Sequence, residues 1–301
     1  METPRLSFIM PAWKAAHLHA AIESIAAQDC GDWELVVVDD CSPEDLGSIV
    51  AAFPDSRIRY VRNDSNIGGS DLVAQWNHCL QFARGEYLAL AADDDLYAPE
   101  FCGECLRLAQ KYPSVDVVRS AVEQIDDNDA HVWDDNILPE FTDSREFFNL
   151  WVSGKVFSCI GNFMFRKSAL DRIGGFMNFP CAFGSDIATP IELSGNGVAN
   201  TQEMLFRFRQ GAVHLSADTS RYGEKLRAIS ELSVFLDDKN STLGAVDKEY
   251  LYRKCMYDYF NLVIGNLPAS RLGLIRNCTR AGVRDKAMLL LRWIKKRITG
   301  R

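Results

Sequence analysis

The segments Trp33–Ser42 (WELVVVDDCS) and Glu86–Pro99 (EYLALAADDDLYAP) decide the fold of this chain. Each contains a run of apolar residues that passes directly into acidic residues, Asp39-Asp40 in the first segment and Asp93-Asp94-Asp95 in the second. Short apolar runs of this kind are typical of strands buried on both faces of a sheet. The acidic groups are therefore predicted at the carboxyl ends of two strands, the edge at which open α/β sheets bind ligands.

Helical periodicity alternates with predicted strands through the first 120 residues. Strands are predicted at Leu6–Met10, Arg57–Arg62 and Val115–Ser120, and helices at about 18–28, 70–83 and 99–111. We expect another helix after Asp40, with Ser42 as its N-cap and Pro43 at its first position. The alternation predicts an α/β fold with a parallel sheet covered on both faces.

The second half of the chain is less regular. Residues 123–146 hold nine acids against the single base Arg145, so we expect a solvated insertion or a hairpin there. Beyond it the pattern predicts a strand at Ile160–Arg166 and helices near 144–153 and 186–194. From about residue 222 onward the periodicity indicates helices that end in a basic tail.

Composition bounds the class of protein. The chain has 301 residues, of which 47% are hydrophobic and 25% charged, as in globular domains, and no apolar run approaches the roughly 20 residues of a membrane-spanning helix. The net charge of −8 argues against nucleic-acid coating. Residues 271–301 nevertheless carry ten Lys or Arg and only one acid, so this tail has a charge of +9 and the remainder −17.

The cysteines indicate a reducing environment. Nine cysteines are scattered along the chain, and the first residues lack the charged and apolar regions of a signal peptide. Cys102 and Cys105 form one C-x-x-C, but no second pair lies at metal-site spacing, so we expect ordinary thiols on a helix. The expected location is the cytoplasm.

The acidic triplet Asp93-Asp94-Asp95 points to a cation. Adjacent carboxylates repel one another unless a cation or hydrogen-bond donors compensate, and hard oxygen ligands suit Mg²⁺ or Mn²⁺, which typically bridge a diphosphate. The alternative is an acidic cap that complements a helix dipole. Neither a G-x-G-x-x-G after the first strand nor a G-x-x-x-x-G-K-[ST] occurs, so a phosphate must be held in another way.

Several motifs, taken in order, resemble one family. The chain is similar to the inverting glycosyltransferases of family 2, which have the GT-A fold, over roughly residues 5–216. The resemblance is carried by SFIMPAW, WELVVVDDCS, NIGGSDLVAQWNHCLQFARGEYLALAADDDLYAP, GNFMFRKSALDRIGGF, GSDIATPIEL and FRFRQGAVHLS. It implies a mixed sheet with helices on both faces and a C-terminal helical extension.

The resemblance also implies roles for single residues. Asp93 and Asp95 match the outer members of the family's D-x-D, which grips Mn²⁺ or Mg²⁺ and the donor phosphates, and Asp94 touches the sugar or ribose. Asp186 falls where the family places its catalytic base, although it could equally cap the helix near 186–194. Four further residues match the part of the site that receives the nucleotide base: they are Pro11 with its neighbours Ala12 and Trp13, and Asp40.

The segment Phe206–Ser216 leaves alternatives open. Relatives often have an arginine or histidine ahead of a serine that closes over the diphosphate, and either Arg209 or His214 fits that place; His214 is also a candidate metal ligand. The alternation of Phe206, Arg207, Phe208 and Arg209 also fits a half-buried strand with solvated arginines.

The implied activity is transfer of a sugar from a nucleotide diphosphate sugar, UDP-sugar favoured, to a hydroxyl of a glycan or lipid-linked acceptor in surface polysaccharide synthesis. Residues 1–221 would be the glycosyltransferase domain, with the donor part at 1–122 and the acceptor side at 123–221, and 222–301 the helical extension. Alternatives are a nucleotidyltransferase or a catalytically degenerate glycan-binding module. The tail, 284–301, has the composition of a helix that contacts the inner face of the cell membrane, or of one packed on the protein.

Overall fold

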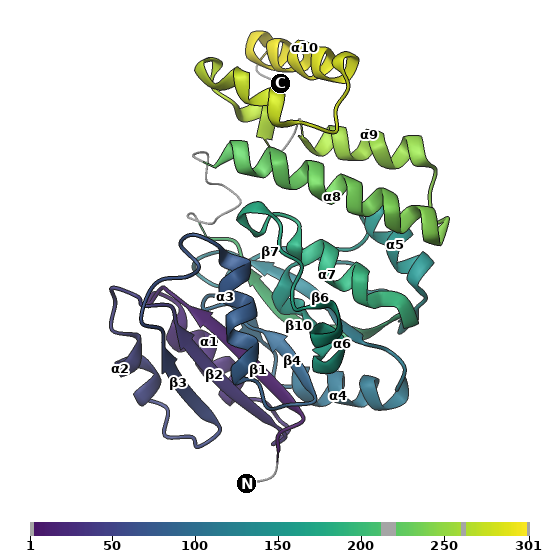
Figure 1. Cartoon of the computed structure of the whole chain (residues 1–301). Coiled ribbons are helices and arrows are strands. Elements are labelled where there is room, and N and C mark those ends of the chain that lie inside the picture. The colour runs from purple at the N-terminus through teal and green to yellow at the C-terminus, as the bar shows by residue number, and fades with distance from the viewer. Residues whose placement is uncertain (1–2, 212–220, 260–262, 300–301) are drawn as a thin grey trace. The chain divides into compact units, whose positions relative to one another are not determined.

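The computed structural model describes residues 3–211, 221–259 and 263–299 (Figure 1). The chain forms two compact units, each described by itself. Among the described residues, the first unit comprises 3–177 and 189–211, and the second comprises 178–188, 221–259 and 263–299. The segment 178–188, which contains Asp186, thus groups with the C-terminal helices.

The first unit is built on a mixed sheet. Its main strand order is β3-β2-β1-β4-β9-β6-β10-β5, with β7 beside β6 and β8 beside β10. The strands are β1 (Leu6–Ala12), β2 (Trp33–Asp39), β3 (Ile58–Arg62), β4 (Tyr87–Leu90), β5 (Leu96–Tyr97), β6 (Val117–Ile125), β7 (His131–Asp134), β8 (Phe141–Thr142), β9 (Phe163–Arg166) and β10 (Val198–Arg209). Strands β1 to β4 run parallel, whereas β9 lies antiparallel between β4 and β6. The parallel sheet expected from the alternation is therefore found in β1 to β4, and β9, which comes from a later part of the chain, makes the sheet mixed, as the family resemblance implies.

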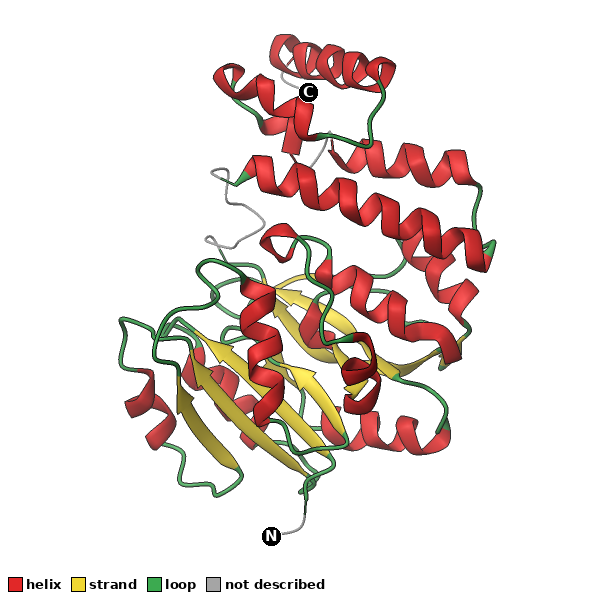
Figure 2. Ribbon diagram, viewed as in Figure 1, coloured by secondary structure: helices red, strands yellow, loops and turns green. Residues whose placement is uncertain are grey.

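Helices cover the sheet (Figure 2). They are α1 (Leu18–Ala26), α2 (Leu46–Ala51), α3 (Leu72–Cys79), α4 (Phe101–Lys111), α5 (Ser144–Val152) and α6 (Lys167–Ile173), with 3₁₀ turns η1 (Leu80–Phe82), η2 (Ile160–Asn162) and η4 (Ser194–Asn196). Every residue of β2 is buried, which is the pattern of a strand covered on both faces. The α/β expectation from the apolar runs is confirmed.

Two local expectations need correction. Asp45, not Ser42, caps α2 by accepting the N–H of Ser48 at 3.1 Å. Ser42 instead donates its hydroxyl to the carbonyl of Trp13 at 2.7 Å, so it holds a loop rather than starting a helix. The predicted strand at Ile160–Arg166 begins with a 3₁₀ turn and is extended only in β9.

The acidic segment 123–146 contains the expected hairpin, since β7 pairs antiparallel with β6. It is not wholly solvated, however. Asp135 is fully buried and pairs with Arg119 of β6, whose side chain is also fully buried. An acid of this kind resembles its exposed neighbours in sequence and is distinguished only by its partner across the fold.

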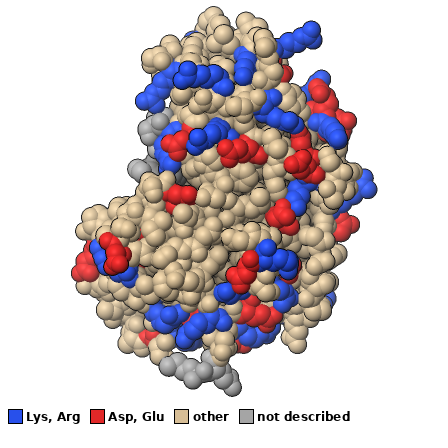
Figure 3. All heavy atoms as spheres, viewed as in Figure 1, with Lys and Arg blue, Asp and Glu red and all other residues tan. Residues whose placement is uncertain are grey.

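The second unit is helical. It contains η3 (Pro180–Ala182), the start of α7 (Ser185–Leu193), α8 (Tyr222–Leu243), α9 (Lys248–Asp258), η7 (Ile264–Asn266), η8 (Ala269–Asn277) and α10 (Val283–Thr299). Figure 3 shows Lys and Arg side chains gathered over the region of α8 to α10 on the face in view. None of the helices in the described part of the chain is long and apolar enough to cross a membrane.

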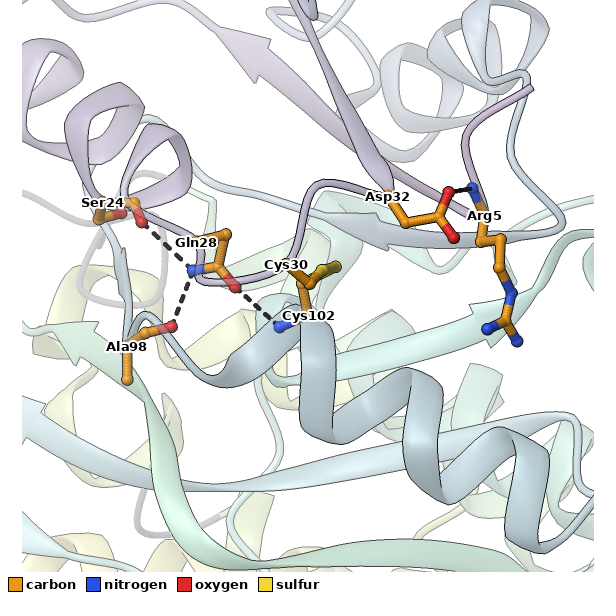
Figure 4. Close-up of a disulfide and its surroundings, with 7 residues drawn as sticks. All are labelled: Arg5, Ser24, Gln28, Cys30, Asp32, Ala98 and Cys102. Carbon is orange, nitrogen blue, oxygen red and sulfur yellow. Dashed lines mark hydrogen bonds between the residues drawn. A yellow bond between two sulfur atoms is a disulfide. The ribbon is translucent and has the colours of Figure 1, made fainter. Parts of the chain in front are cut away.

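A disulfide joins Cys30 to Cys102 across 72 residues of chain (Figure 4). Gln28 reinforces the same junction, because its side chain donates to the carbonyl of Ala98 at 2.7 Å and accepts the N–H of Cys102 at 2.7 Å. The expectation of an ordinary thiol is wrong for Cys102, whereas Cys105 is a buried thiol. Sequence spacing could not reveal a partner that the fold brings from the end of α1.

Candidate functional site

The turn Asp93–Asp95 connects β4 to β5 at the carboxyl edge of the parallel strands. Tyr97 of β5 anchors this turn in the core. Its ring contacts Phe8 and Phe206 edge to face, with centroids 5.1 and 5.0 Å apart, and its hydroxyl donates to the carbonyl of Gly161 at 2.9 Å. The turn is therefore held from its carboxyl side by a packed aromatic cluster.

Asp93 connects the turn to the end of β1. Its Oδ2 accepts the backbone N–H groups of Trp13 at 2.7 Å and of Lys14 at 2.8 Å. Burial raises the pKa of the Asp93 carboxyl, and these two N–H groups oppose the shift. The contact brings together two predicted site segments, Pro11–Trp13 and the acidic triplet.

Asp95 connects the turn to the end of β10. Its Oδ1 accepts the N–H of Arg209 at 2.8 Å, which continues the pairing of β5 with β10. Asp95 is buried; its burial and the neighbouring charge of Asp94 raise the pKa of its carboxyl well above the ordinary value. The pKa of Asp94 is also raised, by burial and by the charge of Asp93. The turn thus concentrates negative charge that the protein itself compensates incompletely.

Arg209 is a buried brace between the turn and the β6–β7 hairpin. Its Nε donates to the carbonyl of Asp94 at 2.8 Å and its Nη1 to the carbonyl of Asp126 at 2.9 Å, while Nη2 pairs with the carboxylate of Asp129 at 2.6 Å. The interpretation of a solvated arginine on a half-buried strand is therefore wrong for this residue. Sequence reasoning missed Asp129; its signal is the polar turn sequence, and its φ of 63° is a turn conformation that Asp tolerates.

Asp40 lies at the end of β2, and its carboxylate is saturated by its own chain. Oδ1 accepts the side-chain amide of Asn63 at 2.8 Å and the N–H of Ile67 at 2.9 Å. Oδ2 accepts the N–H of Gly68 at 2.7 Å and the amide of Asn66 at 3.1 Å. A Cβ on Gly68 would lie 3.0 Å from Oδ2, so glycine permits this close approach. Asp40 therefore organises the loop that follows β3.

The end of β1 lies between the two acidic groups. The carbonyl of Ala12 accepts the N–H of Asp40 at 3.0 Å, and the N–H of Trp13 donates to Asp93. Pro11 is partly buried, whereas Trp13 is 41% exposed and so is available for stacking. The fold thus brings Pro11–Trp13, Asp40, Asp93–Asp95 and Arg209 to one edge of the sheet.

Asp186 belongs to the second unit and occupies the first turn of α7. Burial raises the pKa of its carboxyl to about 7, against the opposing effect of its own N–H and that of Ile187. The preceding Gly184 has a φ of 96°, and a Cβ there would lie 2.8 Å from a methyl group of Leu232 in α8, which explains the glycine at this position. Phe179 meets Phe235 of α8 edge to face, with centroids 6.5 Å apart, so the segment before Asp186 is anchored on α8.

The acidic turn offers two carboxylates to a metal, but the described residues do not complete a metal site. No three His, Cys, Asp or Glu side chains in the described ranges come together as a metal-holding group. His214, the other candidate ligand, lies outside the described residues. The chemistry of the turn fits a divalent cation, because Asp93 and Asp95 each use one oxygen for a backbone N–H and retain a second hard oxygen within a turn of surplus negative charge.

Comparison with known proteins gives the family and the fold. A family model described as "Glycosyl transferase family 2" matches residues 7–174, more than half of the chain. The chain is 40% identical over 101 residues to the putative colanic acid biosynthesis glycosyl transferase WcaA of Escherichia coli (strain K12). This alignment covers 33% of this chain and 35% of WcaA, so the chain matches about a third of the length of this curated relative.

Two solved structures show the same architecture over most of the chain. S. aureus TarS in complex with UDP-GlcNAc superposes with a TM-score of 0.70 at 15% identity, covering 91% of this chain and 79% of TarS. The mannosyltransferase PcManGT from Pyrobaculum calidifontis, in complex with GDP-Man and Mn²⁺, gives a TM-score of 0.57 at 19% identity, covering 98% and 81%. The expected GT-A fold with a C-terminal helical extension is confirmed.

Proposed function

Since this chain belongs to glycosyltransferase family 2, we propose that it transfers a sugar from a nucleotide diphosphate sugar to a hydroxyl of a glycan or lipid-linked acceptor. The observation that carries the proposal is the acidic turn, whose Asp93 is held by the N–H groups of Trp13 and Lys14 and whose Asp95 is held by that of Arg209. The turn occupies the ligand-binding edge of the sheet. A UDP-sugar is the favoured donor, supported by the UDP-GlcNAc bound to TarS.

In this proposal Asp93 and Asp95 would hold Mn²⁺ or Mg²⁺, and the ion would supply positive charge against the leaving diphosphate. Two carboxylate oxygens are fewer than the six ligands such cations take, so the donor phosphates and water would supply the rest. The Mn²⁺ in PcManGT supports this assignment. Arg209 holds the turn in place through the carbonyl of Asp94.

Asp186 is proposed as the base that takes the proton of the acceptor hydroxyl in an inverting displacement. A carboxyl with a pKa of about 7 is ionised for a substantial part at neutral pH and is also a stronger proton acceptor than an ordinary aspartate. The exposed Trp13 and the neighbouring Pro11 are proposed to contact the nucleotide base. Asp40 acts on that contact through the backbone, since its N–H donates to the carbonyl of Ala12.

The tail helix α10 is proposed to contact the inner face of the cell membrane. One face packs on the second unit, with Leu289 buried and the indole N–H of Trp293 donating to the carbonyl of Leu267 at 2.8 Å. Its other apolar side chains remain exposed among basic residues; they include Leu290, Leu291, Ile294 and Ile298. This is the composition of an interfacial helix that anionic lipid attracts.

The proposed donor class is tested by calorimetric titration of the full chain with UDP, GDP, CDP and dTDP, each with Mn²⁺ and again with EDTA. We expect one nucleotide, UDP in the favoured case, to bind only when the metal is present. The variant Asp32→Asn should bind the same nucleotide with unchanged affinity, because Asp32 lies near the amino end of β2, away from the acidic turn. Folded protein that binds none of the four nucleotides would contradict the proposed function.

A further inference from the structure

A cavity of about 710 Å³ opens in the second unit between the first turn of α8 and η8. Its wall is unusually rich in arginine and in small polar groups. The lining includes Arg221, Arg227, Arg271 and Arg276, with Glu224, Ser270, Asn277 and Thr279 between them. The cavity lies within one unit, and no residue of the acidic turn contributes to it.

The charge of this cavity is strongly positive. Among the described residues that line it, four are arginines and one is an acid, Glu224, which pairs with Arg221 at 2.6 Å. Arg227 and Arg276 are exposed, and the ion pair of Arg227 with Glu231 is long, at 3.9 Å. An exposed arginine in a weak pair can turn its planar fork toward an oxyanion at little cost.

The backbone of the wall adds to this preference. Gly223 lies in the first turn of α8, a helix of 22 residues, and the N-cap residue Arg221 makes no side-chain capping bond. The N–H groups of that turn carry the positive end of the helix dipole. Asn277 donates its amide to the carbonyl of Gly223 at 3.3 Å, so η8 and α8 form a fixed wall rather than two independent segments.

We propose that this arginine cavity binds a phosphate-bearing anion, with a diphosphate as the group that its charge fits best. Multiple guanidinium forks and a helix N-terminus are the donors that recognise phosphate oxygens. Unlike the acidic turn, the cavity carries positive charge and needs no metal ion to hold a phosphate. Its binding is therefore expected to survive EDTA, which separates this site experimentally from the proposed donor site.

The phosphate could belong to a soluble molecule or to a lipid headgroup. The lipid source is supported by α10, because Trp293 and Arg297 of that helix both donate to the carbonyl of Leu267, two residues before η8 begins. The exposed apolar side chains of α10 are thus tied to the same short segment that leads into the cavity wall. A lipid headgroup and the adjoining apolar chain would use both features.

The binding test is calorimetric titration of the full chain with inorganic diphosphate in EDTA at low ionic strength. We expect saturable binding that Arg276→Gln weakens about tenfold, as loss of a charge-assisted contact does. Arg253→Gln removes the same charge from an exposed position outside the cavity and should change affinity less than about twofold. Glu224→Gln should tighten binding about threefold, because it removes the negative charge that the described residues place on the wall.

The source is tested by co-sedimentation with phosphatidylcholine vesicles that contain phosphatidic acid. Loss of sedimentation in Arg276→Gln, together with competition by diphosphate, would assign the cavity to a lipid phosphate. Sedimentation unaffected by that variant, with diphosphate binding intact, would assign it to a soluble phosphate. Absence of diphosphate binding by the folded wild-type protein in EDTA, or equal weakening by Arg253→Gln and Arg276→Gln, would overturn the proposal.

Discussion

The two acidic strand ends of the first unit look alike in sequence and differ in the structure. At the end of β2, the carboxylate of Asp40 accepts four hydrogen bonds from the loop that follows β3. At the end of β4, Asp93 and Asp95 accept backbone N–H groups on one oxygen each, and burial raises the pKa of both carboxyls. The carboxylate of the first group is saturated by hydrogen bonds, whereas the second group brings together carboxyls whose charged form burial disfavours.

Asp186 extends this comparison to the second unit. Its pKa is raised to about 7 by burial, and no carboxylate among the described residues is a cause of the shift. For Asp94 and Asp95, the charge of an adjacent aspartate also raises the pKa of the carboxyl. An isolated carboxyl of this kind is suited to taking a proton, and a cluster of carboxyls to taking a cation.

The largest expected effect is on turnover in Asp186→Asn. The amide cannot accept the acceptor proton, so we expect kcat to fall about a thousandfold, within the range for a general base, while donor affinity stays within about twofold. The measurement is steady-state turnover with the donor identified by titration, beside calorimetric donor binding. Asp258→Asn is a control, since Asp258 is another acid of the second unit with a raised pKa. Donor affinity lost together with turnover would count against a base.

The next effect separates the two acidic strand ends directly. Asp95→Asn keeps an oxygen for the N–H of Arg209 but removes the charge, so metal-dependent nucleotide binding should weaken about a hundredfold or more. The free energy of unfolding in EDTA should not fall, because burial and Asp94 disfavour the charged carboxyl in the folded protein. Calorimetry and urea unfolding measure the two quantities. Unchanged nucleotide affinity would remove Asp95 from the metal site.

Asp40→Asn should lower the stability of the protein more than its nucleotide affinity, the reverse of the result expected for Asp95→Asn. An amide offers one accepting oxygen in place of two, so at least one partly buried donor of the loop Asn63–Gly68 loses its partner. We expect the free energy of unfolding to fall by about 2 kcal/mol in urea titrations. Nucleotide affinity of the folded fraction should change far less than in Asp95→Asn. A variant as stable as the wild type would show that these hydrogen bonds do not organise the loop.

The sequence predicted the strand–helix alternation and both acidic edges because local patterns carry that information. A buried strand such as β2 needs an apolar run, and the residues after it must lie at the sheet edge. The sequence could not predict that hydrogen bonds saturate the carboxylate of Asp40 but not that of Asp95, because the donors lie 23 to 114 residues away in the chain. The burial of Arg209 and the disulfide between Cys30 and Cys102 were not predicted for the same reason. Periodicity is visible in the local sequence, whereas the identity of a distant partner is not.

The smallest expected effect is the pH dependence set by Asp186. A base must be ionised, so kcat should rise about tenfold per pH unit below 7 and level off above it, since the pKa is about 7.

The stability of the folded protein should change with pH in the opposite direction. The pKa lies above the ordinary value of 3.8, so stability present at pH 4 is lost as the pH rises through 7. Asp186→Asn should therefore unfold at a higher temperature than the wild type at pH 8 and at a similar temperature at pH 4, as calorimetric scans would measure. A gain of equal size at both pH values would show that ionisation of Asp186 is not its cause, and would contradict the raised pKa that supports its proposed role as a base.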